Sequence, residues 1–256
     1  MLAIDRLKKI EELLKENGSI VISQLSDMLD VSEETIRRDL EKLSKTMKFR
    51  RVRGGAYLYE SSDTEVPVKI REQIYIKEKQ VIGAKSVSFI DDGDTIMLDS
   101  STTALYIAKN LNLSKKKVTV ITNSIKIANE LADNSLIKII NLGGTLRRRT
   151  KSYVGYMTTD SLMDLSADKA FVSCSSVNVK FGVTDNHNLE ARVRKGMLNN
   201  SVKKFLVVDY TKFEEPAVNK ICDIKDIDVI IIDRKLSNEQ LDVLKKHKIE
   251  VVCCEE

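Results

Sequence analysis

Short apolar runs recur along the C-terminal two thirds of the chain, and helical stretches separate them. The runs cover residues 95–98, 118–121, 137–140, 170–173, 205–208 and 229–232. They are rich in β-branched residues and have the length of strands that are buried on both faces. Strands that alternate with helices build a parallel sheet covered by helices on both sides. The pattern therefore predicts an α/β domain, with a further strand near Cys253 and Cys254 at the end of the chain.

Polar residues follow several of these predicted strands. They are Asp99, Ser100, Ser101, Thr102 and Thr103 after the first, Thr122, Asn123 and Ser124 after the second, Gly143 and Gly144 after the third, and Asp209 to Lys212 after the fifth. Taken alone, hydroxyls before a helix usually serve as N-caps, and a glycine pair can be a turn. Because the carboxyl ends of parallel strands share one edge of the sheet, the segments are expected to converge there. Hydroxyls, free helix-start amides and the Lys212 charge then favour binding of a phosphate.

Three short helices are predicted at the N-terminus. The first has apolar residues at positions 7, 10, 13 and 14 and ends at Asn17-Gly18-Ser19. The second spans about 23–29, with Leu25, Met28 and Leu29 expected to face inward. The third begins after Ser32 as its N-cap and buries Ile36, Leu40 and Leu43. Three helices with a tight turn before the last one are typical of a helix-turn-helix, whose last helix enters the major groove of DNA.

Basic charge is concentrated on the third helix and the segment after it. The whole chain carries only +4, whereas residues 35–57 contain eight basic and two acidic side chains, a net charge of +6. Residues 48–53 and 56–58 can form two strands around Gly54-Gly55, which would make a wing. A solvated charged face is the alternative interpretation. The residues expected to contact DNA are Ser32, Thr35, Arg37, Arg38, Lys42, Arg51 and Arg53.

Two segments carry a family resemblance. Val31-Ser32-Glu33-Glu34-Thr35-Ile36-Arg37-Arg38-Asp39-Leu40 and Arg51-Val52-Arg53-Gly54-Gly55-Ala56 resemble the DeoR family of bacterial sugar-metabolism repressors. The resemblance continues through Asp168-x-Ala170-Phe171, Gly182-x-Thr184, Glu190-Ala191 and Asp209-x-x-Lys212-Phe213. It implies a winged helix-turn-helix followed by a sensor domain similar to ribose-phosphate isomerase, and it adds Asp168 and Glu190 to the effector-binding residues. Three features depart from the family: Arg53 replaces the usual histidine, the usual glycine of the wing turn is missing around residues 46–48, and Arg194 stands where lysine is common.

Together these features predict a DNA-binding domain at 1–58, a linker at 59–69 and an α/β effector-sensing domain at 70–256 that opens with a helix over about 70–90. The predicted function is a repressor that binds double-stranded operator DNA as a dimer or tetramer and is released by a phosphorylated sugar. An activator built from the same parts stays an alternative. So does a sugar-phosphate isomerase or deaminase, with Asp99, Asp168, Asp185 or Glu190 as the base.

No cofactor or metal is expected. The two histidines and four cysteines lack the spacing of a metal site, and the cysteines are expected to be reduced thiols. We expect Asp39 to be a structural partner of a neighbouring arginine, and the Arg147-Arg148-Arg149 run to be either a solvated loop or the rim of the effector site. No apolar run is long enough to span a bilayer, and the first residues lack the layout of a signal peptide, so a cytoplasmic protein is expected.

Overall fold

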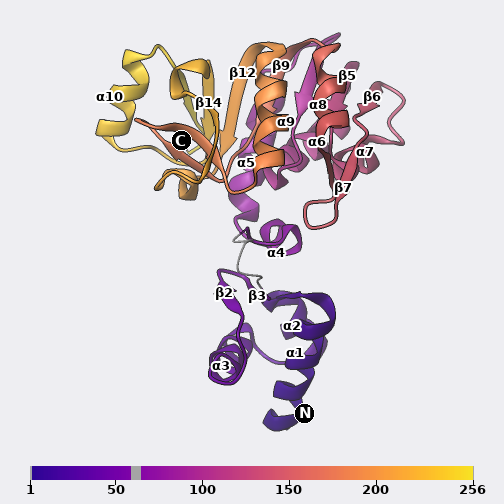
Figure 1. The fold of residues 1–256 in the computed structure, drawn as a ribbon, viewed down its shortest axis with the longest axis vertical. Helices are drawn as coiled ribbons and strands as arrows, with labels where there is room; N and C mark the ends of the chain where they lie inside the picture. Colours follow the sequence, from indigo (N-terminus) through magenta and orange to yellow (C-terminus); the bar gives the residue numbers. More distant parts are fainter. Residues whose placement is uncertain (1, 59–64, 256) are drawn as a thin grey trace. The chain divides into compact units, whose positions relative to one another are not determined.

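The predicted strands form a seven-stranded parallel sheet in the order β15-β14-β12-β9-β4-β5-β6 (Figure 1). In this computed structural model, which describes residues 2–58 and 65–255, all neighbouring strands of the sheet run parallel. The strands are β4 (Thr95–Leu98), β5 (Val118–Thr122), β6 (Ile137–Asn141), β9 (Ala167–Val172), β12 (Ser201–Val208), β14 (Val229–Ile232) and β15 (Glu250–Cys253). The α/β prediction is therefore confirmed. The chain builds outward from β4 toward β6 and then from β9 toward β15, so the topological switch point lies between β4 and β9.

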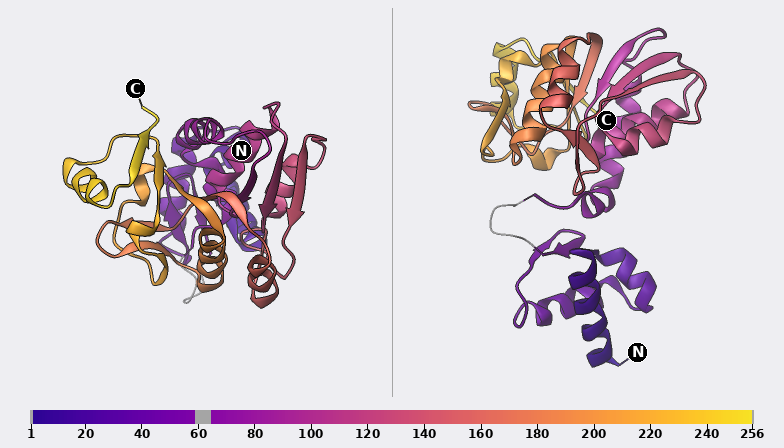
Figure 2. Two further views of the ribbon diagram at one scale, coloured as in Figure 1. Left: turned by 90° about the horizontal axis from the view of Figure 1, so that it is seen from above. Right: turned by 45° about the vertical axis from the view of Figure 1, so that its right-hand side comes forward.

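Helices cover both faces of the sheet, and each face has its own apolar core (Figure 2). The helices α5 (Ile76–Val87), α6 (Thr102–Asn112) and α7 (Ile125–Leu131) contribute to one core, while α8 (Tyr156–Met163), α9 (Asn188–Asn199) and α10 (Asn238–Lys246) contribute to the other. Side chains alternate along each strand, so Ile96 and Leu98 enter the first core and Met97 enters the second. This double burial explains the continuous apolar runs in the sequence.

Smaller elements surround the carboxyl edge of the sheet. An antiparallel sheet contains β10 (Ser176–Asn178), β11 (Gly182–Asp185) and β13 (Asn219–Cys222), and a hairpin contains β7 (Thr145–Arg147) and β8 (Ser152–Val154). Two short 3-10 turns, η1 (Tyr210–Lys212) and η2 (Ile224–Asp226), follow β12 and β13. None of these small strands was predicted from the sequence. They supply several side chains of the site described below.

The N-terminal residues form a winged helix-turn-helix, as predicted. Its elements are α1 (Ala3–Asn17), β1 (Ser19–Val21), α2 (Ile22–Leu29), α3 (Glu33–Leu43), β2 (Arg50–Val52) and β3 (Gly55–Tyr57). Gly18 ends α1 in the left-handed conformation with φ 69°, which suits a residue without a Cβ. The additional strand β1 pairs with β3, giving the order β1-β3-β2. Met28 was expected to face inward, but its side chain is exposed because Leu25 and Leu29 fill that side of α2.

A buried ion pair joins the first and third helices of this unit. Arg6 of α1 donates from Nε to Oδ2 of Asp39 on α3 over 2.5 Å, and both residues are buried. Asp39 thus has a structural role as the partner of an arginine, but this arginine is Arg6 of α1, 33 residues away, and not a neighbour in the sequence as predicted. Because an unpaired charge in this position would be costly, the pair constrains how α1 crosses α3.

The segment after the wing differs from the prediction. A single helix over 70–90 was expected, but α4 (Val68–Gln73) ends before Ile74, and α5 begins at Ile76. Tyr75 between them has φ 53°, which is incompatible with a continuous helix. Val68 and Ile70 are buried, and Ile70 packs with Val21 and Tyr57.

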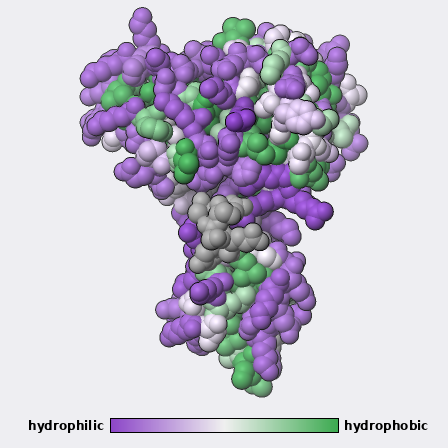
Figure 3. All heavy atoms as spheres, in the orientation of Figure 1, coloured by the Kyte–Doolittle hydropathy of each residue, from purple (hydrophilic) through white to green (hydrophobic). Residues whose placement is uncertain are grey.

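The chain consequently divides into the compact units Met1–Ile76 and Lys77–Glu256, whereas the sequence analysis began the second domain at residue 70. Part of the predicted linker, residues 59–64, lies outside the described residues. Across residues 2–58 and 65–255, no helix is long and apolar enough to cross a membrane. Figure 3 shows apolar residues interspersed with hydrophilic ones on the face in view.

We predict that Asp39→Ala lowers the free energy of unfolding of the N-terminal unit by about 3–5 kcal/mol, because it leaves the Arg6 guanidinium without its buried partner. Urea titration of the full chain measures this. The exposed Glu41→Ala on the same helix is the control and should change stability by less than about 0.5 kcal/mol. Replacing both partners by apolar residues should recover much of the loss; a double variant as unstable as Asp39→Ala would contradict the explanation.

Candidate effector site and DNA-binding surface

The polar residues after β4 and β5 lie where the sequence analysis placed them, at the carboxyl edge of the sheet. Residues 99–103 and 122–124 are all buried. Ser101 is the N-cap of α6, accepting from the Ala104 amide over 3.0 Å, and Ser124 is the N-cap of α7. The first segment stands at the switch point between β4 and β9, where ligands bind in open parallel sheets.

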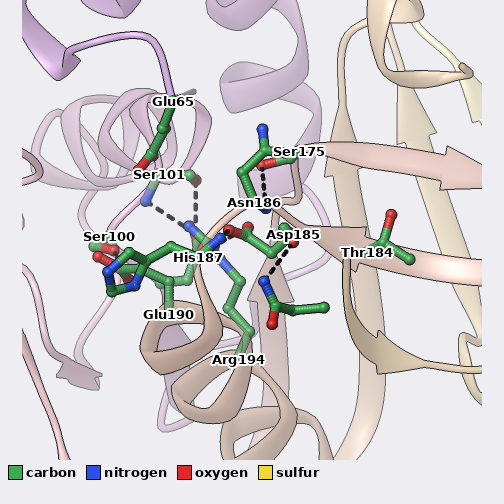
Figure 4. Close-up of polar contacts among 12 residues, drawn as sticks. Glu65, Ser100, Ser101, Ser175, Thr184, Asp185, Asn186, His187, Glu190 and Arg194 are labelled. Atoms are coloured by element: carbon green, nitrogen blue, oxygen red, sulfur yellow. Dashed lines mark hydrogen bonds and ion pairs between the residues drawn. The ribbon is translucent and has the colours of Figure 1, made fainter. Parts of the chain in front are cut away.

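Arg194 is the central cation of this edge. It rises from α9, donates from Nε to Asp99 Oδ2 over 2.6 Å, and pairs through Nη1 with Asp185 at the end of β11 (Figure 4). Asp99 also accepts from the Ser101 hydroxyl over 2.6 Å through Oδ1. Burial would lower the pKa of Arg194, but Asp185, Asp99 and Glu190 outweigh it and raise the pKa well above its ordinary value. Arg194 is therefore a permanent positive charge.

Glu190 lies one turn before Arg194 and accepts three hydroxyl groups. Ser100 donates to Oε2 over 2.9 Å, while Thr150 and Ser152 donate to Oε1 over 2.8 Å and 2.6 Å. Burial would raise the pKa of Glu190, but Arg194 and the hydroxyl donors together hold it below its usual value. Glu190 is thus an anion and a weak base at neutral pH, which suits hydrogen bonding better than proton abstraction.

Several polar groups near this edge have no hydrogen-bond partner within the described part of the chain. They are Oδ1 of Asn123, which is fully buried, and Nδ1 of His187. The backbone amides of Thr102 and Thr103, in the first turn of α6, likewise make no hydrogen bond to described residues. Free amides at a helix start can donate to an anion, and a bare amide oxygen can accept from a hydroxyl. The edge therefore offers donors and acceptors together.

The remaining predicted effector residues divide into two groups. Thr122 Oγ1 accepts from the Ser124 amide, Gly143 and Gly144 follow β6 beside Thr158, and Lys212 is in η1 after β12, so all of them belong to the carboxyl edge. Asp168 does not. It lies near the start of β9 and accepts from the Thr95 amide over 2.8 Å, at the amino end of the sheet. The structure therefore separates Asp168 from the other predicted site residues.

The hairpin β7–β8 brings Thr150 and Ser152, which were not predicted from the sequence, and Arg147, whose role was left open, to the site. Thr150 and Ser152 bind Glu190, and Arg147 places Nη1 3.7 Å from Glu190 Oε1 with a side chain that is only 10% exposed. Arg148, by contrast, is exposed. Both alternatives left open for the arginine run therefore occur: Arg147 lies at the site, and Arg148 is exposed to solvent. The sequence could not distinguish the buried arginine from the exposed one, because the pairing of β7 with β8 decides in which direction each side chain points.

The predicted DNA contacts lie at the start of α3, along its exposed side and on the wing. Ser32 caps α3 by accepting from the Thr35 amide over 3.2 Å. Arg37 pairs with Glu33, and Arg38 reaches Glu34 over 3.4 Å with 73% of its side chain exposed. Lys42 is exposed on α3, and Arg51 and Arg53 are exposed on the wing. The seven residues occupy the two elements that a winged helix-turn-helix presents to DNA.

Family models match both parts of the chain. Residues 6–62 match the DeoR-like helix-turn-helix domain, and residues 74–234 match the DeoR C-terminal sensor domain. An HTH-type transcriptional regulator, YulB, of Bacillus subtilis (strain 168) is 36% identical, with 98% of this chain and 96% of the relative covered. The lactose phosphotransferase system repressor of Lactococcus lactis subsp. lactis is 35% identical, covering 94% of this chain and 95% of its own. Among solved structures, ribose 5-phosphate isomerase A from Neisseria gonorrhoeae is 16% identical with a TM-score of 0.39, covering 54% of this chain and 53% of its own.

We predict that Glu190→Gln makes stability less sensitive to acid. A group whose pKa is lowered by folding contributes stability above its ordinary pKa, about 4.5, and that contribution is lost as the pH falls through the folded value. Urea unfolding of the parent and the variant, near neutral pH and below about pH 4.5, measures the difference. The exposed Glu239→Gln is the matched control. A decline with acid equally steep in parent and Glu190→Gln would contradict the assigned role.

Proposed function

Because this chain belongs to the DeoR family of transcriptional regulators, we propose that it represses sugar-metabolism genes and leaves its operator when a phosphorylated sugar binds at the carboxyl edge of the sheet. The unit Met1–Ile76 binds DNA, and the unit Lys77–Glu256 senses the effector. The observation that carries the proposal is the pair of unpartnered amides of Thr102 and Thr103 beside a cluster of buried hydroxyls and charges.

Charge and position together support DNA binding by α3 and the wing. The net charge of +6 over residues 35–57 matches the phosphate backbone, and α3 presents Thr35, Arg37, Arg38 and Lys42 away from its buried side. Arg38 has the most exposed of the arginine side chains on α3, so we assign it to base contacts in the major groove. Ser32, Arg51 and Arg53 then contact the backbone on either side of that helix.

In the proposed site, the phosphate and the sugar of the effector contact different groups of the protein. The phosphate accepts hydrogen bonds from the Thr102 and Thr103 amides and hydroxyls at the start of α6, with Lys212 supplying positive charge. The sugar hydroxyls face Asn123 Oδ1 and the buried carboxylates, which accept hydrogen bonds. Such a site needs differential binding alone, and no chemical step, to control a regulator. We therefore expect no turnover of the sugar phosphate.

The protein should bind DNA as a dimer or a higher even-numbered oligomer, because a single helix-turn-helix contacts too few base pairs for useful specificity and a two-fold operator matches paired heads. Light scattering at micromolar concentration together with DNA footprinting measures both properties. We expect a mass of at least twice 28.9 kDa and two protected half-sites. A monomer that protects one half-site would contradict this part of the proposal.

Thr102→Ala should weaken effector binding while operator affinity is unchanged. The Thr102 hydroxyl makes no hydrogen bond to described residues, so its removal leaves the cap of α6 intact, whereas Ser101 is bonded to Asp99. Losing one charged hydrogen bond of about 1.5–3 kcal/mol corresponds to roughly 10- to 150-fold weaker binding.

Thermal shift with phosphates of ribose, fructose, glucose and glucosamine first identifies a ligand of the parent, and titration of operator release then compares the variants. Thr119→Ala is the matched control, since Thr119 pairs with Thr95 at the amino end of the sheet. Identical release curves for Thr102→Ala and the parent would place the phosphate elsewhere.

A further inference from the structure

A basic groove lies between α3 and the wing of the N-terminal unit. It has a volume of about 440 Å³ and is lined by Arg37, Arg51 and Arg53, by the backbone of Gly54 and Gly55, and by Leu40 at its apolar floor. No acidic residue lines the groove in the described part of the chain, although Arg37 is paired with Glu33 and Glu34 of its own helix. Three arginines around one hollow, together with backbone groups of a turn, supply donors suited to a phosphate oxygen.

Arg53 does not extend freely from the wing turn. Its Cζ lies 4.5 Å from the centroid of the Tyr75 ring, so the guanidinium stacks on an aromatic face. Tyr75 follows α4, and it has φ 53°, a conformation that a bulky residue seldom adopts. A conformation of this kind persists only where the surroundings enforce it.

Two contacts fix Tyr75 beside the wing. Ile74 lies against Gly54, so closely that a Cβ at Gly54 would come within 2.3 Å of Ile74 Cγ2. One turn earlier, Ile70 of α4 is fully buried against Val21 and Tyr57. The chain therefore returns to the wing tip after the wing has been completed, and it delivers an aromatic ring to the arginine that lines the groove.

We propose that this groove binds a backbone phosphate of DNA and that Tyr75 is a positioning residue that holds Arg53 in the groove. The inference rests on the proposed DNA-binding function and assigns a role to a residue outside the helix-turn-helix and the wing. Stacking restricts the rotamers of Arg53, so less conformational entropy is lost when its guanidinium meets a phosphate. Tyr75 thus contributes to DNA affinity through Arg53, without contacting DNA itself.

The test is the salt dependence of binding to a mixed-sequence DNA duplex, measured by fluorescence anisotropy with the full chain. Arg53→Ala should weaken binding and reduce the slope of log K against log salt concentration by about 1, as the loss of one phosphate contact does. Tyr75→Asn removes the ring but keeps a residue that tolerates positive φ, and it should weaken binding by about two- to fivefold. Tyr75→Phe keeps the ring and should bind like the parent.

The double variant Arg53→Ala/Tyr75→Asn separates positioning from a general structural effect. If Tyr75 acts through Arg53, the double variant binds no more weakly than Arg53→Ala. Lys9→Ala, an exposed lysine of α1, is the control and should leave the slope unchanged. Parent-like affinity of Tyr75→Asn, or an additive loss in the double variant, overturns the proposal while the DNA-binding function stands. Failure of the parent itself to bind duplex DNA overturns both.

Discussion

The buried guanidinium of Arg194 organises the carboxyl edge of the sheet. It joins Asp99 after β4 to Asp185 at the end of β11, and it is the main positive charge acting on Glu190 of its own helix. Removing one partner of such a buried pair typically costs about 3–5 kcal/mol, because the other charge is left without compensation. Three carboxylates collected around one guanidinium would otherwise repel one another, so the positions of β4, β11 and α9 depend on this cation.

The same charge balance limits where an anion can bind. The cluster holds three negative charges, on Asp99, Asp185 and Glu190, and two positive charges, on Arg194 and Arg147. Its net charge is therefore negative. In the proposed site, a phosphate is expected at the amides of Thr102 and Thr103, which form the positive end of the α6 dipole, and not inside the cluster. The proposed sugar phosphate would then have one orientation that satisfies both regions, with its hydroxyls toward the carboxylates.

Local sequence signals predicted the strands and caps but not the long-range pairings. Apolar runs such as Val229–Ile232 identify buried parallel strands, and Ser32, Ser101 and Ser124 stand immediately before the helices that they cap. Asp168 was misplaced because the resemblance supplied its role, whereas its position near the start of β9 puts it at the amino end of the sheet. Thr150 and Ser152 could not be predicted from the sequence, since only the pairing of β7 with β8 and the position of α9 bring them close to Glu190. The break at Tyr75 was hidden because apolar residues continue on both sides of it.

The N-terminal unit ends at Ile76, well after the last strand of the wing, because its core needs residues from beyond the wing. A unit of this size buries a small core, and β1 and α4 enlarge it by surrounding Tyr57 with Val21 and Ile70. The strand β1 adds a third member to the wing sheet, and α4 then leads directly to Ile74 and Tyr75 at the wing tip. Tyr75 is followed at once by Ile76, where α5 begins and the chain leaves this unit. The last residues of the N-terminal unit therefore contribute both to its small core, through Ile70, and to the wing, through the stacking of Tyr75 on Arg53.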